Sequence, residues 1–367
     1  MAYITLNRKK LQQNYQFLDN LFKSRIIEWG VVSKMLWGNE IYLKEIIALG
    51  TMEIHDSRIS NIQKIKRLNP GIQTVYIKPP AKRSISRIVR YADVSFNTEI
   101  RTIEWLSEEA IKQGKIHKII IMVEMGDLRE GVLGEELLDF YQRAMSLNGI
   151  SISGIGTNLN CLSGVMPNQD KLIQLSLYKL LIETKFQKTI PWVSGGTSVA
   201  IPLLLKNASP MAVNHFRVGE ALYFGKDLFT GKTMKGMHND VFKLYAEIIE
   251  ITEKPDLPIG ELGKNVAGNS FSMDDQDDLS GSSTRAILDI GLLDMQPQYL
   301  ILEDTKLKII DASSDMTVVD ISHTKKKYKV GDLISFKLDY MGALSILNSN
   351  YVDKSRRLIS MFYFLVN

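Results

Sequence analysis

Short, continuous apolar runs alternate along the first two thirds of the chain with stretches whose apolar residues share one helical face. Continuous runs are typical of strands buried in a parallel sheet, and one-sided stretches are typical of helices packed on that sheet. The runs predict eight strands, at 28–34, 52–57, 73–78, 93–97, 118–126, 152–159, 190–195 and 215–224. Helices are predicted between them, for example over 99–113 and 170–186. This order predicts an α/β fold, a closed (β/α)8 barrel of the TIM type.

After Gly225 the pattern changes to strands without long helices between them. These strands are predicted at 244–251, 283–290, 306–310, 316–321 and 333–338, and they indicate a C-terminal, mainly β domain. A strand at 3–7, followed by a helix at 8–21, lies outside the barrel count. We therefore expect the barrel at 8–235 and the β domain at 1–7 and 236–367. The polar, low-complexity segment 270–283 predicts a mobile loop.

Composition narrows the class of protein. The 367 residues are 45% apolar, which is enough for a large core, and the net charge of +4 comes from 45 basic and 41 acidic residues spread along the chain. This charge does not predict nucleic-acid binding. The single cysteine, Cys161, rules out an intrachain disulfide framework and fits a reducing compartment. No apolar run approaches the roughly 18 residues that span a bilayer, and no signal segment precedes the fold, so we expect a soluble cytoplasmic protein with no membrane partner.

The first predicted strand ends on one cation, Lys34. Barrels of this type place their chemistry at the carboxyl ends of the strands, where a lysine can form a Schiff base. A lysine that merely extends from a strand end into water is the alternative.

Two later strand ends are suited to an anion. Strand seven runs into Ser194-Gly195-Gly196-Thr197-Ser198, and strand eight into Phe216-Arg217-Val218-Gly219-Glu220. Glycines let the backbone approach a phosphate, and hydroxyls and N–H groups can donate to it. The alternative is that these glycines only close turns. Strands five and six add Arg129, which could bind a carboxylate, and Asn158, which could flank a flat ring.

Together these segments resemble the fold-type III enzymes that use pyridoxal 5′-phosphate (PLP), of which alanine racemase is the best known. Within that group the chain is most similar to the ornithine racemase family. The motifs that carry the resemblance are VVSK ending at Lys34, HDSRISN from His55, VEMGDLREGV, GIGTNLNC, VSGGTS and FRVGEALYFG in the barrel, and RAILDIG, ASSDMTVVD, KVGD, DYMGAL and NYV in the second domain.

The resemblance implies a role for each matching residue. It implies that Lys34 forms the internal aldimine with PLP and that Arg217 faces the pyridine nitrogen. An arginine does not give up its proton, so the ring nitrogen stays unprotonated, which favours racemisation over transamination. Asn158, Thr197, Ser198, Gly219, Glu220 and Tyr351 are implied to bind the cofactor. Arg129, Ser314 and Asp315 are implied to bind the substrate, with Lys34, Arg129 and Asp315 catalytic. Ser314 and Asp315 would come from the partner subunit of a homodimer with shared active sites, and no metal is implied.

One departure concerns the second base. Alanine racemases supply it as a tyrosine in a Tyr-Gly turn of the β domain, where this chain has Leu262-Gly263. Removing a proton on one face of Cα and returning it on the other needs two groups, or one that swings. Asp315 and Tyr351 are candidates, and Cys161 is a remote one.

The resemblance implies a racemase that acts on ornithine or another basic amino acid, with an alanine or broad-specificity racemase as the alternative. A side-chain ammonium would need a carboxylate partner such as Asp127, Glu130 or Asp315. Related decarboxylases use a cysteine in the β domain, a D-threonine aldolase would need a metal there, and PLP-carrier (homeostasis) proteins consist of a barrel alone. None of these three alternatives matches the chain well.

Overall fold

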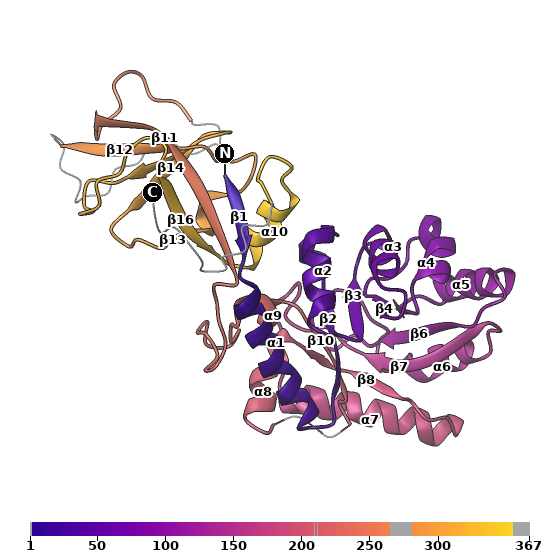
Figure 1. The fold of residues 1–367 in the computed structure, drawn as a ribbon. Helices are drawn as coiled ribbons and strands as arrows, with labels where there is room; N and C mark the ends of the chain where they lie inside the picture. Colours follow the sequence, from indigo (N-terminus) through magenta and orange to yellow (C-terminus); the bar gives the residue numbers. More distant parts are fainter. Residues whose placement is uncertain (1, 209, 211, 265–280, 355–367) are drawn as a thin grey trace. The chain divides into compact units, whose positions relative to one another are not determined.

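The computed structural model describes residues 2–208, 210, 212–264 and 281–354. The chain divides into two compact units, one of residues 9–239 and one of residues 1–8 and 240–367 (Figure 1). The predicted loop at 270–283 lies largely outside the described residues. Within the described residues, no helix is long and apolar enough to cross a membrane.

The larger unit contains a ring of parallel strands. Its strands are β2 (Glu28–Val32), β3 (Glu53–Asp56), β4 (Gln73–Tyr76), β5 (Val94–Asn97), β6 (His117–Met122), β7 (Ile150–Gly156), β8 (Trp192–Ser194), β9 (Gly196–Thr197) and β10 (His215–Val218). They follow the order β8-β7-β6-β5-β4-β3-β2-β10-β9. Because β8 pairs with β7 and β9 pairs with β10, the seventh predicted strand is one strand interrupted at Gly195, and it closes the ring. The predicted barrel is confirmed.

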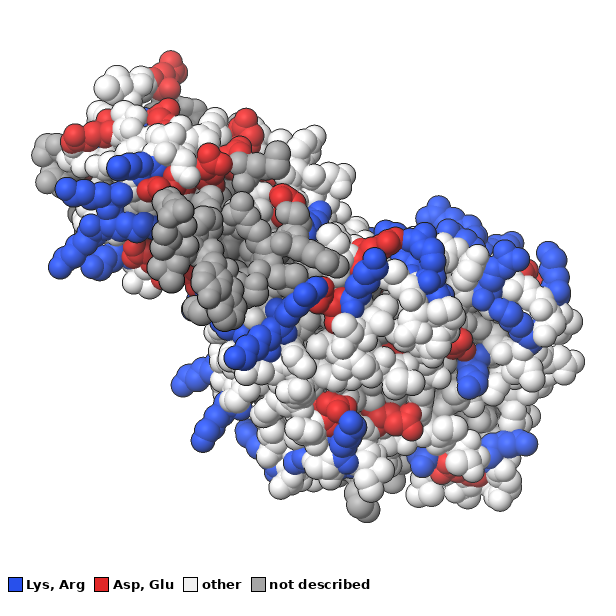
Figure 2. Space-filling model, viewed as in Figure 1, with Lys and Arg blue, Asp and Glu red and all other residues white. Residues whose placement is uncertain are grey.

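Helices cover the outside of this ring (Figure 1). They are α1 (Arg8–Lys23), α2 (Glu40–Ala48), α3 (Ile59–Leu68), α4 (Ile85–Tyr91), α5 (Ile100–Lys112), α6 (Leu137–Met145), α7 (Gln169–Phe186), α8 (Ile201–Leu205) and α9 (Glu220–Phe224), with 3-10 turns η1 (Lys34–Leu36), η2 (Lys82–Ser84) and η3 (Ser198–Ala200). In α5 the buried Ile103, Leu106 and Ala110 repeat at helical spacing. The polar faces carry the Lys and Arg side chains that gather over α3 and α4 in Figure 2.

The smaller unit is built on an antiparallel sheet. Its elements are β1 (Tyr3–Leu6), β11 (Phe242–Pro255), β12 (Ser282–Leu288), η4 (Pro297–Tyr299), β13 (Leu300–Leu302), β14 (Lys308–Ala312), β15 (Thr317–Asp320), β16 (Leu333–Leu338) and α10 (Tyr340–Asn348). The order is β13-β16-β11-β12-β15-β14, with β1 paired to β11. Phe242, Leu244, Ala246 and Ile248 of β11 are all buried at alternate positions, as a sheet with one covered face requires.

Two local predictions were wrong, and two elements were missed. The predicted strand at 215–224 is β10 followed at Glu220 by α9, because the apolar Ala221–Phe224 stretch is buried all round and carries no helical stripe. The first strand ends at Val32, and Lys34 opens η1 instead of ending the strand. The helix α10 and the strand β13 were not predicted.

Candidate active site at the carboxyl ends of the barrel strands

Lys34 lies directly after β2, at the mouth of the barrel, with its side chain exposed. Desolvation among the surrounding groups lowers the pKa of Lys34, and the nearby cations Arg129 and Arg217 lower it further, against the opposing effect of Cys161 and Asp56. A lowered pKa increases the fraction of neutral amine, the form that attacks a carbonyl. The position and the chemistry therefore agree with a lysine that carries a carbonyl cofactor.

Asp56 holds the segment before Lys34 in place. Its carboxylate accepts hydrogen bonds from Ser33 Oγ at 2.8 Å, from the Arg58 backbone N–H at 2.8 Å and from Asn61 Nδ2 at 3.1 Å. Burial raises the pKa of Asp56, and these donors oppose the increase. Asp56 lies within the HDSRISN motif, where no residue spacing distinguishes it from its neighbours.

Arg217 is a buried cation inside the same mouth, with only 4% of its surface exposed. It donates to Asn158 Oδ1 at 2.5 Å, to the carbonyl of Ser194 at 3.3 Å and to the carbonyl of Thr157. Burial lowers the pKa of Arg217 to about 10, so the guanidinium keeps its charge at neutral pH. Its Nε is buried and has no hydrogen-bond partner among the described residues. A buried donor in this state is ready to meet a ligand atom.

Arg129 is paired with a neighbour. Its Nη2 donates to Glu130 Oε1 at 2.6 Å, and its Nε also contacts Glu130. Burial alone would lower the pKa of Arg129, but the bond with Glu130 outweighs this effect and raises it. Glu130 also accepts from Asn158 Nδ2, so the predicted residues Arg129, Asn158 and Arg217 form one connected network. To bind a carboxylate in bidentate fashion, Arg129 has to share or leave Glu130.

The predicted anion site lies where β9 and β10 end. Ser198 Oγ accepts from the backbone N–H of Gly219 at 3.3 Å and of Ala221 at 3.1 Å, and its own hydroxyl proton stays available to donate. Ser198 and Gly219 are buried, and Thr197 and Glu220 beside them are half-buried. A Cβ on Gly219 would lie 3.1 Å from Val32 Cβ, so glycine lets this turn pack against the end of β2, close to Lys34.

Asp127 holds the loop that contains Cys161 beside the barrel mouth. The buried Asp127 carboxylate accepts from the backbone N–H groups of Cys161 at 3.0 Å, Leu162 at 2.9 Å and Val165 at 3.3 Å. Burial raises the pKa of Asp127, but these bonds outweigh it and hold the pKa below its usual range. Asp127 is thus committed to the loop and is not available for a substrate ammonium. The exposed Cys161 thiol lies close enough to influence the pKa of Lys34.

The remaining predicted residues belong to the smaller unit. Ser314 and Asp315 are exposed in the turn between β14 and β15, and Tyr351 is 78% exposed. Leu293 N donates to the Ser314 carbonyl at 2.8 Å, and Asp294 accepts from Ser349 Oγ at 2.6 Å. These bonds join the two segments into one exposed surface, the β-domain patch of Leu293, Ser314, Asp315 and Tyr351. Leu262, which stands where a tyrosine was expected, is also exposed.

These residues fit PLP on three observations: an exposed lysine with a lowered pKa, an unpartnered Nε on a buried arginine, and a hydroxyl and glycine turn at the predicted anion site. In this arrangement Lys34 would carry the cofactor, Ser198, Gly219 and Glu220 would hold its phosphate, and Arg217 would face its ring nitrogen.

Comparison with known proteins gives consistent results. The family model described as "Alanine racemase, N-terminal domain" matches residues 6–227. An ornithine racemase of Acetoanaerobium sticklandii is 37% identical over 352 residues, which cover 96% of this chain and 98% of that protein. A lysine racemase of Thermotoga maritima is 28% identical over 96% of this chain and 97% of its own length. The crystal structure of a Bartonella henselae alanine racemase with covalently bound pyridoxal phosphate superposes with a TM-score of 0.74 at 18% identity, covering 96% of this chain and 98% of that one.

Proposed function

The chain belongs to the alanine racemase family and is a PLP-dependent amino-acid racemase, and from this premise we propose that it interconverts L- and D-ornithine. The observation that carries the reaction type is the mouth of the barrel, where Lys34 with its lowered pKa lies close to the buried cation Arg217. The choice of ornithine rests on the similarity to the ornithine racemase, which extends over nearly the whole length of both chains.

We propose that Lys34 moves the Cα proton on one face of the substrate. Bound PLP supplies an electron-withdrawing ring that stabilises negative charge at Cα. Lys34 is a basic group at the barrel mouth, and its lowered pKa keeps a larger share of neutral amine ready to accept a proton. Asp56 accepts a hydrogen bond from Ser33 Oγ and so holds the residue just before Lys34, at the start of η1.

We propose that Arg217 keeps the ring nitrogen unprotonated. Its pKa of about 10 means that it stays charged at neutral pH, and its contacts with two backbone carbonyls and Asn158 fix its direction. A fixed cation cannot hand a proton to the ring, so negative charge stays concentrated near Cα and is quenched there by proton return. This preference suits a racemase.

We propose that the substrate carboxylate binds Arg129 and that the side-chain ammonium binds an acidic group outside the barrel network. Asp127 is committed to backbone N–H groups, and Glu130 is committed to Arg129 and Asn158. Among the three acids considered, Asp315 is therefore the one left exposed for an ammonium.

We also propose a cytoplasmic location, because the exposed Cys161 thiol suits a reducing compartment.

The substrate proposal predicts the outcome of a panel assay. PLP-loaded protein incubated with L-ornithine should form D-ornithine and exchange the α-hydrogen for deuterium in deuterium oxide, without release of carbon dioxide. We expect kcat/KM for L-ornithine to exceed that for L-alanine by roughly 100-fold or more, because alanine has no side-chain ammonium to pair with Asp315. Chiral chromatography measures this ratio. Equal rates on ornithine and alanine would support a broad-specificity racemase instead, and release of carbon dioxide would indicate a decarboxylase.

We further propose a homodimer in which the β-domain patch of one subunit completes the barrel mouth of its partner. The proposal rests on the resemblance to fold-type III PLP enzymes. It also rests on the exposure of Ser314, Asp315 and Tyr351, which lie together in the β-domain patch of the smaller unit. Two separately inactive variants, Lys34→Ala and Asp315→Ala, should then recover up to about a quarter of wild-type activity when mixed, because half of the dimers are mixed and each has one intact site.

A control for subunit mixing uses two barrel residues. Lys34→Ala mixed with Arg129→Ala should recover nothing, because in a mixed dimer each barrel lacks one of its own groups. Subunit exchange is verified by native mass spectrometry of differently tagged chains. Absence of recovery in the first mixture after verified exchange, or a fully active monomer, would contradict shared sites.

A further inference from the structure

A second cluster of titratable groups lies inside the barrel, nearer the amino ends of the strands than Lys34. Glu53 and His55 project inward from β3 and His215 from the start of β10, and all three are buried, at 7%, 0% and 0% exposure. Glu53 Oε1 lies 2.8 Å from His215 Nε2 and also contacts His55 Nε2. Each of the three side chains offers one possible metal-ligand atom, and these three atoms lie within 4.8 Å of one another. The cofactor and substrate contacts proposed above do not include these groups.

Gly30 explains how residues of β3 and β10 meet. The strand β2 lies between β10 and β3 in the sheet. Gly30 sits in β2, and a Cβ there would lie 2.3 Å from His55 Nε2 and 2.6 Å from Glu53 Oε1. The missing side chain on the middle strand therefore leaves the space in which the outer two strands bring their donor atoms together.

We propose that Glu53, His55 and His215 bind a single divalent cation of the Zn²⁺ type inside the barrel. Two imidazole nitrogens and one carboxylate oxygen form a donor set that zinc uses in proteins, with a fourth position open to water or another small ligand. Zinc–nitrogen and zinc–oxygen bonds of about 2.0–2.2 Å place neighbouring donors of a tetrahedral site roughly 3.4 Å apart. Glu53 Oε1 and His215 Nε2, now 2.8 Å apart, would need to separate by about 0.6 Å to reach this spacing.

The surrounding residues supply the outer contacts of such a site. Ser194 Oγ lies 2.7 Å from His215 Nδ1, so a metal on Nε2 leaves Nδ1–H to donate to this hydroxyl. Gln73 Nε2 donates to Glu53 Oε2 at 2.5 Å and leaves Oε1 for the ion. Burial lowers the pKa of His55, and the two imidazoles lower the pKa of Glu53 although burial opposes this.

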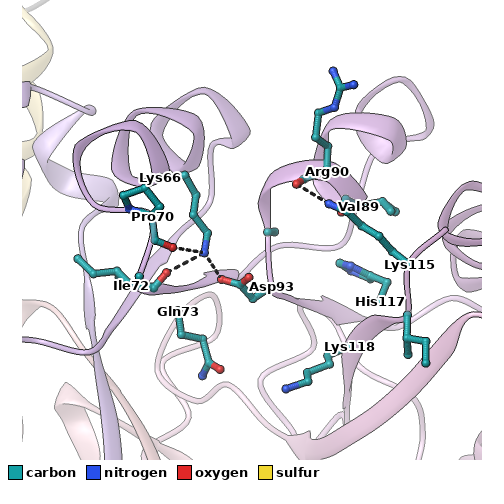
Figure 3. A pocket seen from close by; sticks show the side chains of 13 residues that line it. Lys66, Pro70, Ile72, Gln73, Val89, Arg90, Asp93, Lys115, His117 and Lys118 are labelled. Carbon is teal, nitrogen blue, oxygen red and sulfur yellow. Dashed lines mark hydrogen bonds and ion pairs between the residues drawn. The ribbon is translucent and has the colours of Figure 1, made fainter. Parts of the chain in front are cut away.

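A hollow at the amino ends of β4, β5 and β6 gives an approach from solvent (Figure 3). Its volume is about 510 Å³, and Gln73 is one of its lining residues, so the hollow reaches within one side chain of Glu53. Lys66, Arg90, Lys115 and Lys118 are its basic lining residues, and Lys66 Nζ lies 2.6 Å from Asp93 Oδ2 and 2.8 Å from the Ile72 carbonyl.

The ion would tie β3 to β10 across β2, the strand that leads to Lys34. Its role would be to stabilise the barrel, because binding to the folded state alone raises the unfolding temperature. The proposal does not depend on which amino acid the enzyme racemises.

Metal content tests the proposal directly. Tag-free holoenzyme produced in zinc-supplemented medium should retain about one zinc per chain by plasma mass spectrometry after gel filtration. His215→Gln and Glu53→Gln should each lower zinc affinity by roughly 100-fold or more, measured by competition with a chromophoric chelator. His117→Gln is the matched control. His117 is also buried and lies 2.8 Å from a serine hydroxyl, on Ser95, but it is not part of the cluster.

Thermal unfolding gives an independent readout. Added Zn²⁺ should raise the unfolding temperature of the wild type and of His117→Gln, and should leave that of His215→Gln unchanged. The wild type alone decides the question if the cluster variants fail to fold. Wild-type protein without zinc and without measurable zinc affinity would overturn the proposal, and so would equal zinc binding by His215→Gln, which would place the metal on the surface.

Discussion

Replacing Lys34 by alanine should abolish racemisation, lowering kcat by roughly 10³-fold or more. The change removes both the amine that carries PLP and the group that moves the Cα proton on one face. Borohydride treatment of the wild-type holoenzyme should fix the cofactor to a single peptide that contains Lys34, and no peptide of Lys34→Ala should carry it. Chiral chromatography and peptide mass mapping measure the two effects.

Lys44→Ala is the matched control for this experiment. Lys44 is an exposed lysine of the next helix, α2, and its loss should leave both activity and labelling unchanged. The pH dependence gives a further check. Desolvation by the surrounding groups lowers the pKa of Lys34 from 10.5, so PLP capture by the apo chain should rise with pH and level off below 10.5. Cofactor fixed to a peptide without Lys34, or full activity of Lys34→Ala, would remove the basis of the proposed mechanism.

The barrel was predictable because each of its strands carries the same local signal. A strand buried on both faces is a continuous apolar run, and the helices between these runs show their inward stripes, as Ile103, Leu106 and Ala110 do in α5. The hydrophobic pattern did not identify the element type where a short element is completely buried. The helix α9 has four consecutive buried residues after Glu220, so its composition cannot distinguish a short helix from the continuation of β10.

The candidate site was predictable in part because barrels bring strand ends together whatever their separation in sequence. Lys34, Asn158, Ser198 and Arg217 come from distant segments, yet each follows or ends a strand, which is enough to place them at one mouth. Side-chain pairing is a different matter. The bonds of Arg129 to Glu130 and of Asp127 to the loop at Cys161 depend on loop conformations that no periodicity encodes.

The buried cluster of Glu53, His55 and His215 also could not be predicted from the sequence. Glu53 and His55 are two residues apart in one strand, which predicts a shared face, but His215 is far away in the sequence. Only the register of β10, β2 and β3, together with the missing side chain of Gly30, brings the third group to the first two. A glycine within a strand signals close approach, but it does not say what approaches.

Replacing Arg217 by glutamate should change the reaction type as well as the rate. A glutamate at this position would favour a protonated ring nitrogen, which spreads negative charge into the ring and away from Cα. We expect racemisation to fall by roughly 100-fold or more, and the ratio of transamination to racemisation to rise by about 10-fold or more. Oxo-acid formation measures the first reaction, and chiral chromatography with α-deuterium exchange measures the second.

The structure adds a stability cost to this experiment, which the control has to separate from the chemistry. Arg217 donates to the carbonyls of Thr157 and Ser194, so a carboxylate there would face two acceptors in a buried site, at a cost of about 3–5 kcal/mol of unfolding free energy. Arg217→Lys keeps the positive charge, so it should slow racemisation without raising the transamination ratio. Both variants are compared at equal folded fraction, established by thermal unfolding. If the two variants show the same transamination ratio as the wild type, the charge at this position does not direct the fate of Cα, and Arg217 serves the fold alone.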